Sequence, residues 1–153
     1  MKRIPPTDYY IEEEMIYPKV EAKIESASND CFGCGGKNPI GLKLLFERIQ
    51  DGWVKSVFVP SEHHIGWPGV VHGGIIATLL DEAMGYVSYC EGVKALTAKM
   101  ELRYFQPVKI GEKLIVTGRL VKRKWKMMET EGKLTRFDGT KVADATATML
   151  IVD

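Results

Sequence analysis

The sequence predicts an α+β fold, in which an antiparallel sheet of five to six strands wraps around one long central helix. Three observations support this prediction. The stretch from Gly73 to Cys90 repeats apolar side chains at helical spacing. The segments before and after it repeat them with a period of two, which is typical of strands. Because the strands come in runs and do not alternate with helices, an antiparallel sheet with one segregated helix is favoured.

Composition indicates the broad class of protein. The chain has 153 residues, of which 45% are hydrophobic and 27% charged, as in one ordinary soluble domain. A formal net charge of +1 argues against a dedicated nucleic-acid-binding protein. No apolar run reaches membrane-spanning length and the first residues lack the layout of a signal peptide, so we expect no membrane association. Three cysteines without an export signal favour reduced thiols and a cytoplasmic location.

The first 30 residues are expected to form an arm or short helix on the outside of the domain, and residues 31–153 to form the domain itself. Pro5, Pro6 and Pro18 interrupt this first segment. Its run of glutamates at 12–14 is most simply a solvated face, so we expect no chemistry there.

A turn-rich loop runs from Cys31 to Leu42. Its C-x-x-C pair, Cys31 and Cys34, is half of a zinc site, and His63 and His64 offer candidate further ligands. The spacing matches no zinc finger or ribbon, however. We therefore expect two loop thiols and no bound metal.

Two strands are predicted before the helix. Within residues 42–46 apolar side chains recur at every second position, and the turn at Asp51-Gly52 leads into a second strand over 53–59. Pro60 ends that strand. The loop over 61–68 then leads to a glycine-rich turn.

The predicted helix has two unlike faces. Its broad apolar face consists of Ile75, Ile76, Leu79, Leu80, Ala83, Met84 and Val87. A narrow strip of small or polar residues lies opposite: Gly74, Thr78, Asp81, Gly85 and Ser88. Asp81 is the anomaly, because aspartate favours caps and turns over helix interiors. The simplest explanation is a solvated patch of Asp81 and Glu82, but the helix is apolar over most of its circumference and Asp81 is surrounded by small residues.

The helix entry has its own chemical character. Gly73 and Gly74 leave the first backbone N–H groups accessible. Such groups, together with the helix macrodipole, form an anion site. A donor for a developing negative charge and a nearby carboxylate are the minimal equipment for acyl transfer. The stretch from Gly73 to Asp81 therefore indicates acyl-transfer chemistry.

Four strands are predicted after the helix, at residues 95–103, 113–121, 126–137 and 141–152. We expect them to form a meander, with Thr97 and Arg103 on the same face of the first strand. The last strand has small residues on one face, namely Ala143, Ala145 and Ala147. These alanines would let the helix or a second sheet approach closely. One helix cannot cover such a sheet on both sides, so we expect homodimers that join sheets edge to edge.

From Val70 to Asp81 the chain reads Val-Val-His-Gly-Gly-Ile-Ile-Ala-Thr-Leu-Leu-Asp. This motif is accompanied by the loop of residues 31–42, by Leu96-Thr97 and by the stretch 103–112. Over most of residues 31–152 the sequence resembles the hotdog-fold acyl-CoA thioesterases, in the branch related to the phenylacetate-pathway thioesterase. The resemblance implies hydrolysis of an acyl-CoA to free acid and coenzyme A, with no cofactor besides the coenzyme A of the substrate.

The resemblance also implies roles for individual residues. Asp81 matches the family's catalytic carboxylate, acting as nucleophile or as general base toward water. The backbone N–H of Gly73, next to His72, matches the group that polarises the thioester carbonyl. Thr97 matches a strand hydroxyl that positions the attacking water. The family's site lies across a dimer interface, so Gly73 and Asp81 would come from different subunits, and two dimers would associate into a tetramer.

Substrate binding has further candidates. Relatives often carry Asn or Gln several residues before the His-Gly-Gly, where this chain has Gly66, and His64 is the candidate replacement. Gly74 lies beside the carbonyl site. The phosphates of coenzyme A have as candidate partners Arg103, Arg123, Lys124 and Lys126. The last three belong to a basic cluster that is equally well explained as a charged hairpin turn, and its Trp125 would stack on adenine or pack on the sheet.

Two other functions stay open. A hotdog hydratase or dehydratase, acting on 2-enoyl or 3-hydroxyacyl thioesters, needs an acid–base pair, for which His72 and Asp81 are candidates. A non-catalytic acyl-CoA-binding protein would keep the pocket but has no reason to keep Asp81. The sequence does not identify the acyl group, because pocket depth depends on tertiary and dimer geometry.

Overall fold

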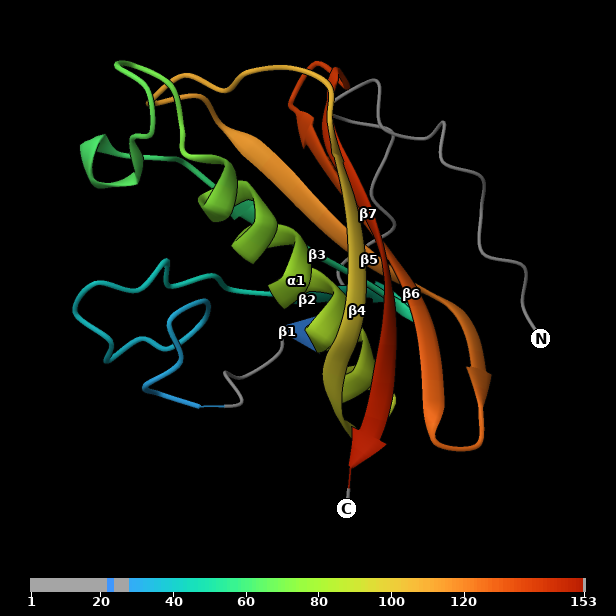
Figure 1. Cartoon of the computed structure of the whole chain (residues 1–153). Helices are drawn as coiled ribbons and strands as arrows, with labels where there is room; N and C mark the ends of the chain where they lie inside the picture. The colour runs from blue at the N-terminus through green and yellow to red at the C-terminus, as the bar shows by residue number, and fades with distance from the viewer. Residues whose placement is uncertain (1–21, 24–27, 153) are drawn as a thin grey trace.

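The computed structural model describes residues 22–23 and 28–152. Most of the predicted N-terminal arm, residues 1–21 and 24–27, lies outside the described residues, so that prediction stays open. One helix, α1 (Gly73–Cys90), lies across one face of a single antiparallel sheet (Figure 1). This arrangement is the hotdog fold, and the predicted fold class is confirmed.

The sheet consists, over the described residues, of seven strands: β1 (Ala22–Lys23), β2 (Glu47–Gln50), β3 (Trp53–Phe58), β4 (Lys94–Tyr104), β5 (Leu114–Lys124), β6 (Met127–Arg136) and β7 (Lys141–Val152). Their order in the sheet is β1-β2-β3-β5-β6-β7-β4, and every neighbouring pair is antiparallel. The two-residue β1 extends the sheet beyond the five to six strands expected. A 3-10 turn, η1 (Glu62–His64), precedes α1.

The first predicted strand begins later than expected. Leu42, Leu44 and Phe46 are buried at alternate positions, as predicted, but strand pairing starts only at Glu47. Lys43, whose φ of 54° lies in the left-handed region, interrupts the extended backbone, and the N–H groups of Leu42 and Leu44 donate to the preceding loop, to the carbonyls of Phe32 and Gly33. Residues 42–46 therefore contribute to the core without joining the sheet.

The predicted four-strand meander is wrong for its first strand. β5, β6 and β7 form a meander, whereas β4 pairs with β7 at the far edge of the sheet. The helix explains this order, because α1 crosses the face of the sheet after β3 and delivers the chain to the opposite edge (Figure 1). β5 then returns to pair with β3.

The core lies between α1 and the face of the sheet that contacts it, which we call the inner face. Of the predicted apolar face of α1, all residues except the half-buried Ile75 are buried. Ala143, Ala145 and Ala147 on β7 are buried as well, as predicted for a strand that faces the helix. Tyr86 of α1, which the predicted apolar face did not include, stacks on Phe46 with ring centroids 4.3 Å apart. No helix in the described part of the chain is long and apolar enough to cross a membrane.

Candidate active site

The loop before α1 delivers His72 to the helix entry. Its backbone closes on itself, because Gly66 N–H donates to the carbonyl of Val70 at 2.8 Å and His72 N–H donates to the carbonyl of His64 at 2.8 Å. The His72 ring then caps α1: its Nδ1 accepts the N–H of Gly74 at 2.8 Å. His72 is therefore the N-cap residue, and the hydrogen bond from Gly74 uses its Nδ1 as the acceptor.

The cap decides which N–H groups stay accessible at the helix entry. Gly74 N–H is occupied by His72, whereas Gly73 N–H donates to no group among the described residues. The carbonyl of Gly73 accepts the hydroxyl of Tyr104, at the end of β4, at 2.8 Å. Burial raises the pKa of Tyr104, which keeps this phenol a donor at neutral pH. The structure thus anchors Gly73 through its carbonyl and leaves its N–H for a ligand.

Asp81 and Thr97 come together as the family resemblance implies. Thr97, on β4, donates a hydrogen bond from Oγ1 to Oδ1 of Asp81, on α1, at 2.8 Å. Asp81 is half-buried and Thr97 exposed in this single chain. The second oxygen of Asp81 accepts no hydrogen bond from the described residues, so it is available for the proton of a water molecule.

Gly73 and Asp81 are far apart within one chain. Eight residues of helix separate them, and at 1.5 Å per residue this is about 12 Å along the axis. A ligand atom bound to the N–H of Gly73 would therefore lie out of reach of Asp81 in the same chain.

The predicted strip of small and polar residues on α1 is largely accessible. Gly74, Thr78, Asp81 and Gly85 are exposed or half-buried, while the fifth predicted member, Ser88, is buried. Its hydroxyl donates to the carbonyl of Gly85 at 2.6 Å and so needs no outside partner. The strip therefore ends one turn earlier than predicted.

His64 lies beside the helix entry, on η1. Its Nδ1 accepts the N–H of Ser61 at 2.9 Å, and its ring packs on Phe58 with centroids 5.2 Å apart. Burial, and next the neighbouring His63, lower the pKa of His64, so the neutral ring is favoured. A side chain at Gly66 would meet the Cα of His72 at 3.0 Å, so the close approach of these two backbones favours glycine there.

Arg103 and Thr97 lie on opposite faces of β4, so the prediction that they share a face is wrong. Thr97 pairs with Met149 of β7 but Lys99 pairs with Thr148, which leaves one extra residue on β4. This bulge reverses the alternation of side chains beyond it. The sequence pattern offers no sign of it.

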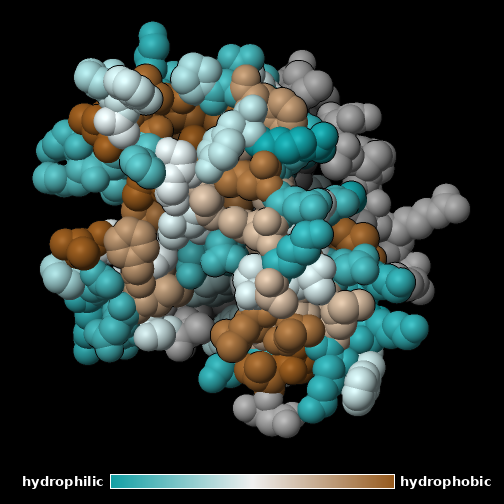
Figure 2. Space-filling view, in the orientation of Figure 1, coloured by the Kyte–Doolittle hydropathy of each residue, from teal (hydrophilic) through white to brown (hydrophobic). Residues whose placement is uncertain are grey.

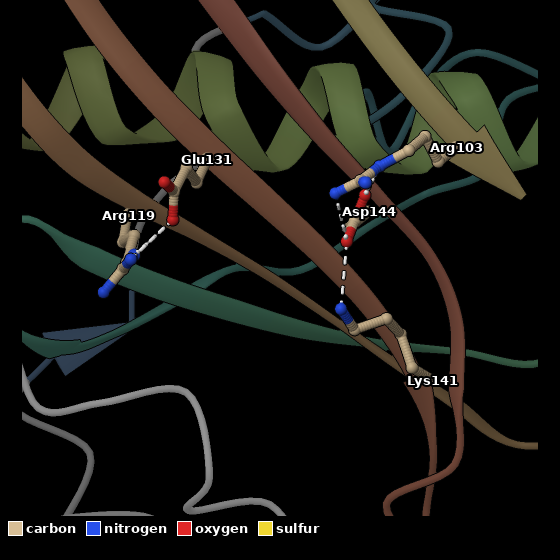
Figure 3. Close-up of polar contacts among 5 residues, drawn as sticks. All are labelled: Arg103, Arg119, Glu131, Lys141 and Asp144. Carbon is tan, nitrogen blue, oxygen red and sulfur yellow. Dashed lines mark hydrogen bonds and ion pairs between the residues drawn. The ribbon is translucent and has the colours of Figure 1, made fainter. Parts of the chain in front are cut away.

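Arg103 instead joins a set of ion pairs on the outer face of the sheet, away from α1 (Figure 3). Its Nε lies 3.2 Å from Oδ1 of Asp144, and Lys141 Nζ lies 3.0 Å from Oδ2 of the same carboxylate. Close by, Arg119 Nη2 lies 2.6 Å from Glu131 Oε2. The guanidinium of Arg103 is thus already matched by a carboxylate.

The basic cluster forms the turn between β5 and β6. Arg123 pairs with Glu91, at the end of α1, over 3.8 Å. Lys124 is exposed, and Trp125 takes a positive φ of 52° with 87% of its surface exposed. Trp125 therefore does not pack on the sheet, and its indole is free to stack on a ligand.

The C-x-x-C loop lies against α1 beside Asp81. Ligand atoms of Cys31, Cys34 and Glu82 all lie within 4.8 Å of one another. Burial raises the pKa of Glu82, and hydrogen bonds from the thiols of Cys31 and Cys34 oppose that rise. His63 and His64 are not part of this group among the described residues. Sequence reasoning missed Glu82, because 51 residues separate it from Cys31.

Comparison with known families gives one clear match. The model of the Thioesterase superfamily matches residues 68–143, from the turn before α1 to the start of β7. Among curated proteins, mouse acyl-coenzyme A thioesterase THEM4 is 32% identical over 111 residues, which is 72% of this chain and 47% of that protein. The chain thus spans about half the length of this relative.

Two solved structures extend the comparison. A Streptococcus mutans UA159 protein bound to acetyl CoA is 28% identical, with a TM-score of 0.68 over 71% of this chain and 88% of the other. The Escherichia coli PaaI protein, from the phenylacetic acid degradation operon, has a TM-score of 0.70 over 73% of this chain and 81% of the other. At 15% identity, PaaI shares the fold.

Proposed function

Because this chain belongs to the thioesterase superfamily through residues 68–143, we propose that it hydrolyses an acyl-CoA to a free acid and coenzyme A. The observation that carries the proposal is the 2.8 Å hydrogen bond from Thr97 to Asp81, next to an unoccupied carboxylate oxygen. The uncommitted N–H of Gly73 supplies the second requirement, a donor for the oxyanion. The names of the relatives, an acyl-CoA thioesterase and an acetyl-CoA complex, agree with this assignment.

The residues divide the reaction between them. Gly73 N–H, at the positive end of the helix dipole, polarises the thioester carbonyl and stabilises the oxyanion. Asp81 either attacks the carbonyl carbon, forming an acyl-aspartyl anhydride that water hydrolyses after coenzyme A has left, or takes a proton from the water that attacks the carbon directly. The C–S bond then breaks and coenzyme A leaves as its thiolate. Thr97 donates one hydrogen bond to Asp81 and offers its oxygen lone pairs to the water.

We propose a homodimer, in which Gly73 of one chain and Asp81 of its partner form one site. When two α1 helices run antiparallel around a twofold axis at Ala77, residue 73 of one lies opposite residue 81 of the other, because 77 is their midpoint. Ala77 is half-buried, and Gly74, Thr78 and Gly85 around it are small enough for close helix approach. The edge position of β4 leaves its outer backbone groups available to a second copy.

Two dimers would then form the expected tetramer. Figure 2 shows apolar side chains gathered over the lower ends of β4 and β7. Leu96 and Leu150, which pair across these strands, are 58% and 48% exposed. An apolar patch of this kind supports association of two dimers through this end of the sheet.

Coenzyme A is proposed to bind with its phosphates at the β5–β6 turn. Arg123, Lys124 and Lys126 supply the charge there, and the exposed indole of Trp125 supplies a surface for the adenine. Arg103 is the weaker candidate, because its contact with Asp144 at 3.2 Å is closer than the contact of Arg123 with Glu91 at 3.8 Å. We expect no dissociable cofactor in the reaction and a cytoplasmic location for the protein.

The hydratase alternative fits less well. His72 uses Nδ1 as the helix cap and lies nine residues before Asp81, about 13.5 Å along the helix axis. This separation does not decide between the two functions, because Gly73 and Asp81 also meet only across subunits in the proposed dimer. The cap made by Nδ1 of His72 and the Thr97 hydroxyl beside Asp81, which suits the positioning of a water, weigh against the hydratase. A non-catalytic acyl-CoA-binding protein stays as an outcome of the test below.

The test is thiol release from a panel of acyl-CoAs by the wild type and by Asp81→Asn. We expect hydrolysis of at least one acyl-CoA, reduced by about 10²–10⁴ in Asp81→Asn with the oligomer intact. Equal release by both proteins would remove Asp81 from the mechanism. Binding of acyl-CoA without release by the wild type would identify a non-catalytic binding protein.

A further inference from the structure

The C-x-x-C loop and α1 meet at a group of three metal-ligating side chains outside the acyl-transfer site. Cys31 Sγ donates to Glu82 Oε1 at 3.4 Å, and the Cys34 thiol donates to the same carboxylate. Cys34 is 3% exposed, while Cys31 and Glu82 are half-buried. Two thiols from a loop thus converge on one carboxylate of a helix, and the group keeps an opening to solvent.

Two glycines of the loop make this convergence possible. A Cβ at Gly33 would lie 2.2 Å from Cγ of Glu82, so only glycine lets the loop press onto that side chain. A Cβ at Gly35 would lie 2.5 Å from the nitrogen of Cys31, inside the turn closed by Gly35 N–H to the Cys31 carbonyl at 2.8 Å. The loop is therefore built to hold both sulfur atoms against Glu82.

The charge of the groups around Cys31 and Cys34 favours a metal site over a redox-active dithiol. An active dithiol needs cationic or dipolar surroundings that favour a thiolate. Here a carboxylate faces both thiols, and a negative group disfavours a second negative charge beside it. A divalent cation reverses this balance, because it stabilises two thiolates and the carboxylate together.

The spacing of the ligand atoms agrees with a tetrahedral ion. Bonds of about 2.3 Å to sulfur and about 2.1 Å to oxygen place tetrahedral ligand atoms about 3.5 to 3.8 Å apart. The distance from Cys31 Sγ to Glu82 Oε1 is 3.4 Å, and all the ligand atoms lie within 4.8 Å. A shift of about 1 Å in the half-buried side chain of Cys31 or Glu82 would bring the three ligand atoms to the spacing of a tetrahedral site.

We propose that Cys31, Cys34 and Glu82 bind one Zn²⁺ ion, with a solvent molecule as fourth ligand. Soft thiolates with one carboxylate suit zinc better than magnesium or calcium. On binding, the two thiol protons leave to solvent. The ion ties the loop to α1 one residue beyond Asp81, so it holds the helix in place and takes no part in the hydrolysis.

The test uses the full chain, stripped of metal by a chelator under reducing conditions and titrated with Co²⁺. We expect one Co²⁺ per chain, with thiolate-to-cobalt charge-transfer absorption and the strong visible bands of a tetrahedral ion. Zn²⁺ should then displace the Co²⁺ and abolish these bands. A wild-type protein without charge-transfer absorption overturns the proposal, and so does a Cys31–Cys34 disulfide found by mass spectrometry in the freshly purified protein.

Three variants assign the ligands. Cys34→Ser should lower the charge-transfer absorption to half or less, because only the Cys31 thiolate remains, and Glu82→Gln should keep that absorption but weaken Co²⁺ binding at least tenfold. Cys90→Ser is the matched control, since Cys90 lies outside the group, and should bind like the wild type. Loss of the band in Cys90→Ser, or unchanged binding in Glu82→Gln, contradicts the assignment. Circular dichroism of the apo variants checks their fold, and the test needs no acyl-CoA, so it stands apart from the proposed activity.

Discussion

Replacing Thr97 by Val tests the proposed site most directly. Valine has the shape of threonine and suits a strand equally well, so the change removes one hydroxyl and little else. The lost hydrogen bond, 2.8 Å long and made to a carboxylate, is worth about 1.5–3 kcal/mol. At 1.36 kcal/mol per tenfold in rate, turnover should fall about 10- to 150-fold. Thr97 is exposed, which favours the lower half of this range.

Thr97→Ser is the matched control, because it keeps the hydroxyl. We expect it to stay within about threefold of the wild type in kcat, with KM unchanged for both variants. Thiol release from the best acyl-CoA of the panel measures both constants, and the melting temperature checks the fold. Wild-type turnover in Thr97→Val, or equal losses in the two variants, would refute the role given to the hydroxyl.

Two further predictions concern stability and protonation. Gly118→Ala on β5 puts a Cβ 2.3 Å from the carbonyl oxygen of Ala83, so α1 must shift, at a cost of about 1–3 kcal/mol in the free energy of unfolding. Gly36→Ala is the control, because a Cβ there would meet nothing within 4 Å. Denaturant unfolding measures the stability of both variants, and equal stability would contradict the close packing of β5 against α1 at Gly118. For His64, whose pKa is lowered by burial and then by His63, the unfolded chain binds the proton more tightly. Its contribution to stability is therefore complete above pH 6.5 and is lost as pH falls toward the folded-state value, and an NMR titration midpoint of His64 at or above 6.5 would contradict this sign.

The spacing of apolar residues along the sequence predicted the helix and most of the strands. The apolar spacing of α1 and the period of two in β3 and β5 to β7 predicted these elements to within a few residues, because each buries one face. Lys43 shows where this fails: its neighbours alternate like a strand, yet its left-handed backbone keeps them out of the sheet.

Long-range pairing was beyond the reach of those patterns. β4 has the composition of an ordinary strand, and nothing in it reveals that its partner is β7 and not β5. The bulge after Thr97 depends on that pairing, and so does the face on which Arg103 lies. The pair of Thr97 and Asp81 could be predicted only from the family resemblance.

The polar contacts of α1 explain how the proposed site, divided between two subunits, would be held in place. Apolar burial has no direction, so the core alone lets a helix slide or rotate by a fraction of a residue. Hydrogen bonds do have direction and length. Tyr104 fixes the Gly73 end of the helix and Thr97 fixes Asp81, both from β4, the strand that also offers the free edge of the sheet. If α1 slides along its axis by one residue, each of its side chains moves by about 1.5 Å. In two helices related by a twofold axis, both would slide, so the displacement between a group on one helix and a group on the other would be twice as large. Contacts from the edge strand would therefore set the position of both proposed catalytic groups, Gly73 and Asp81, relative to the partner chain of the proposed dimer.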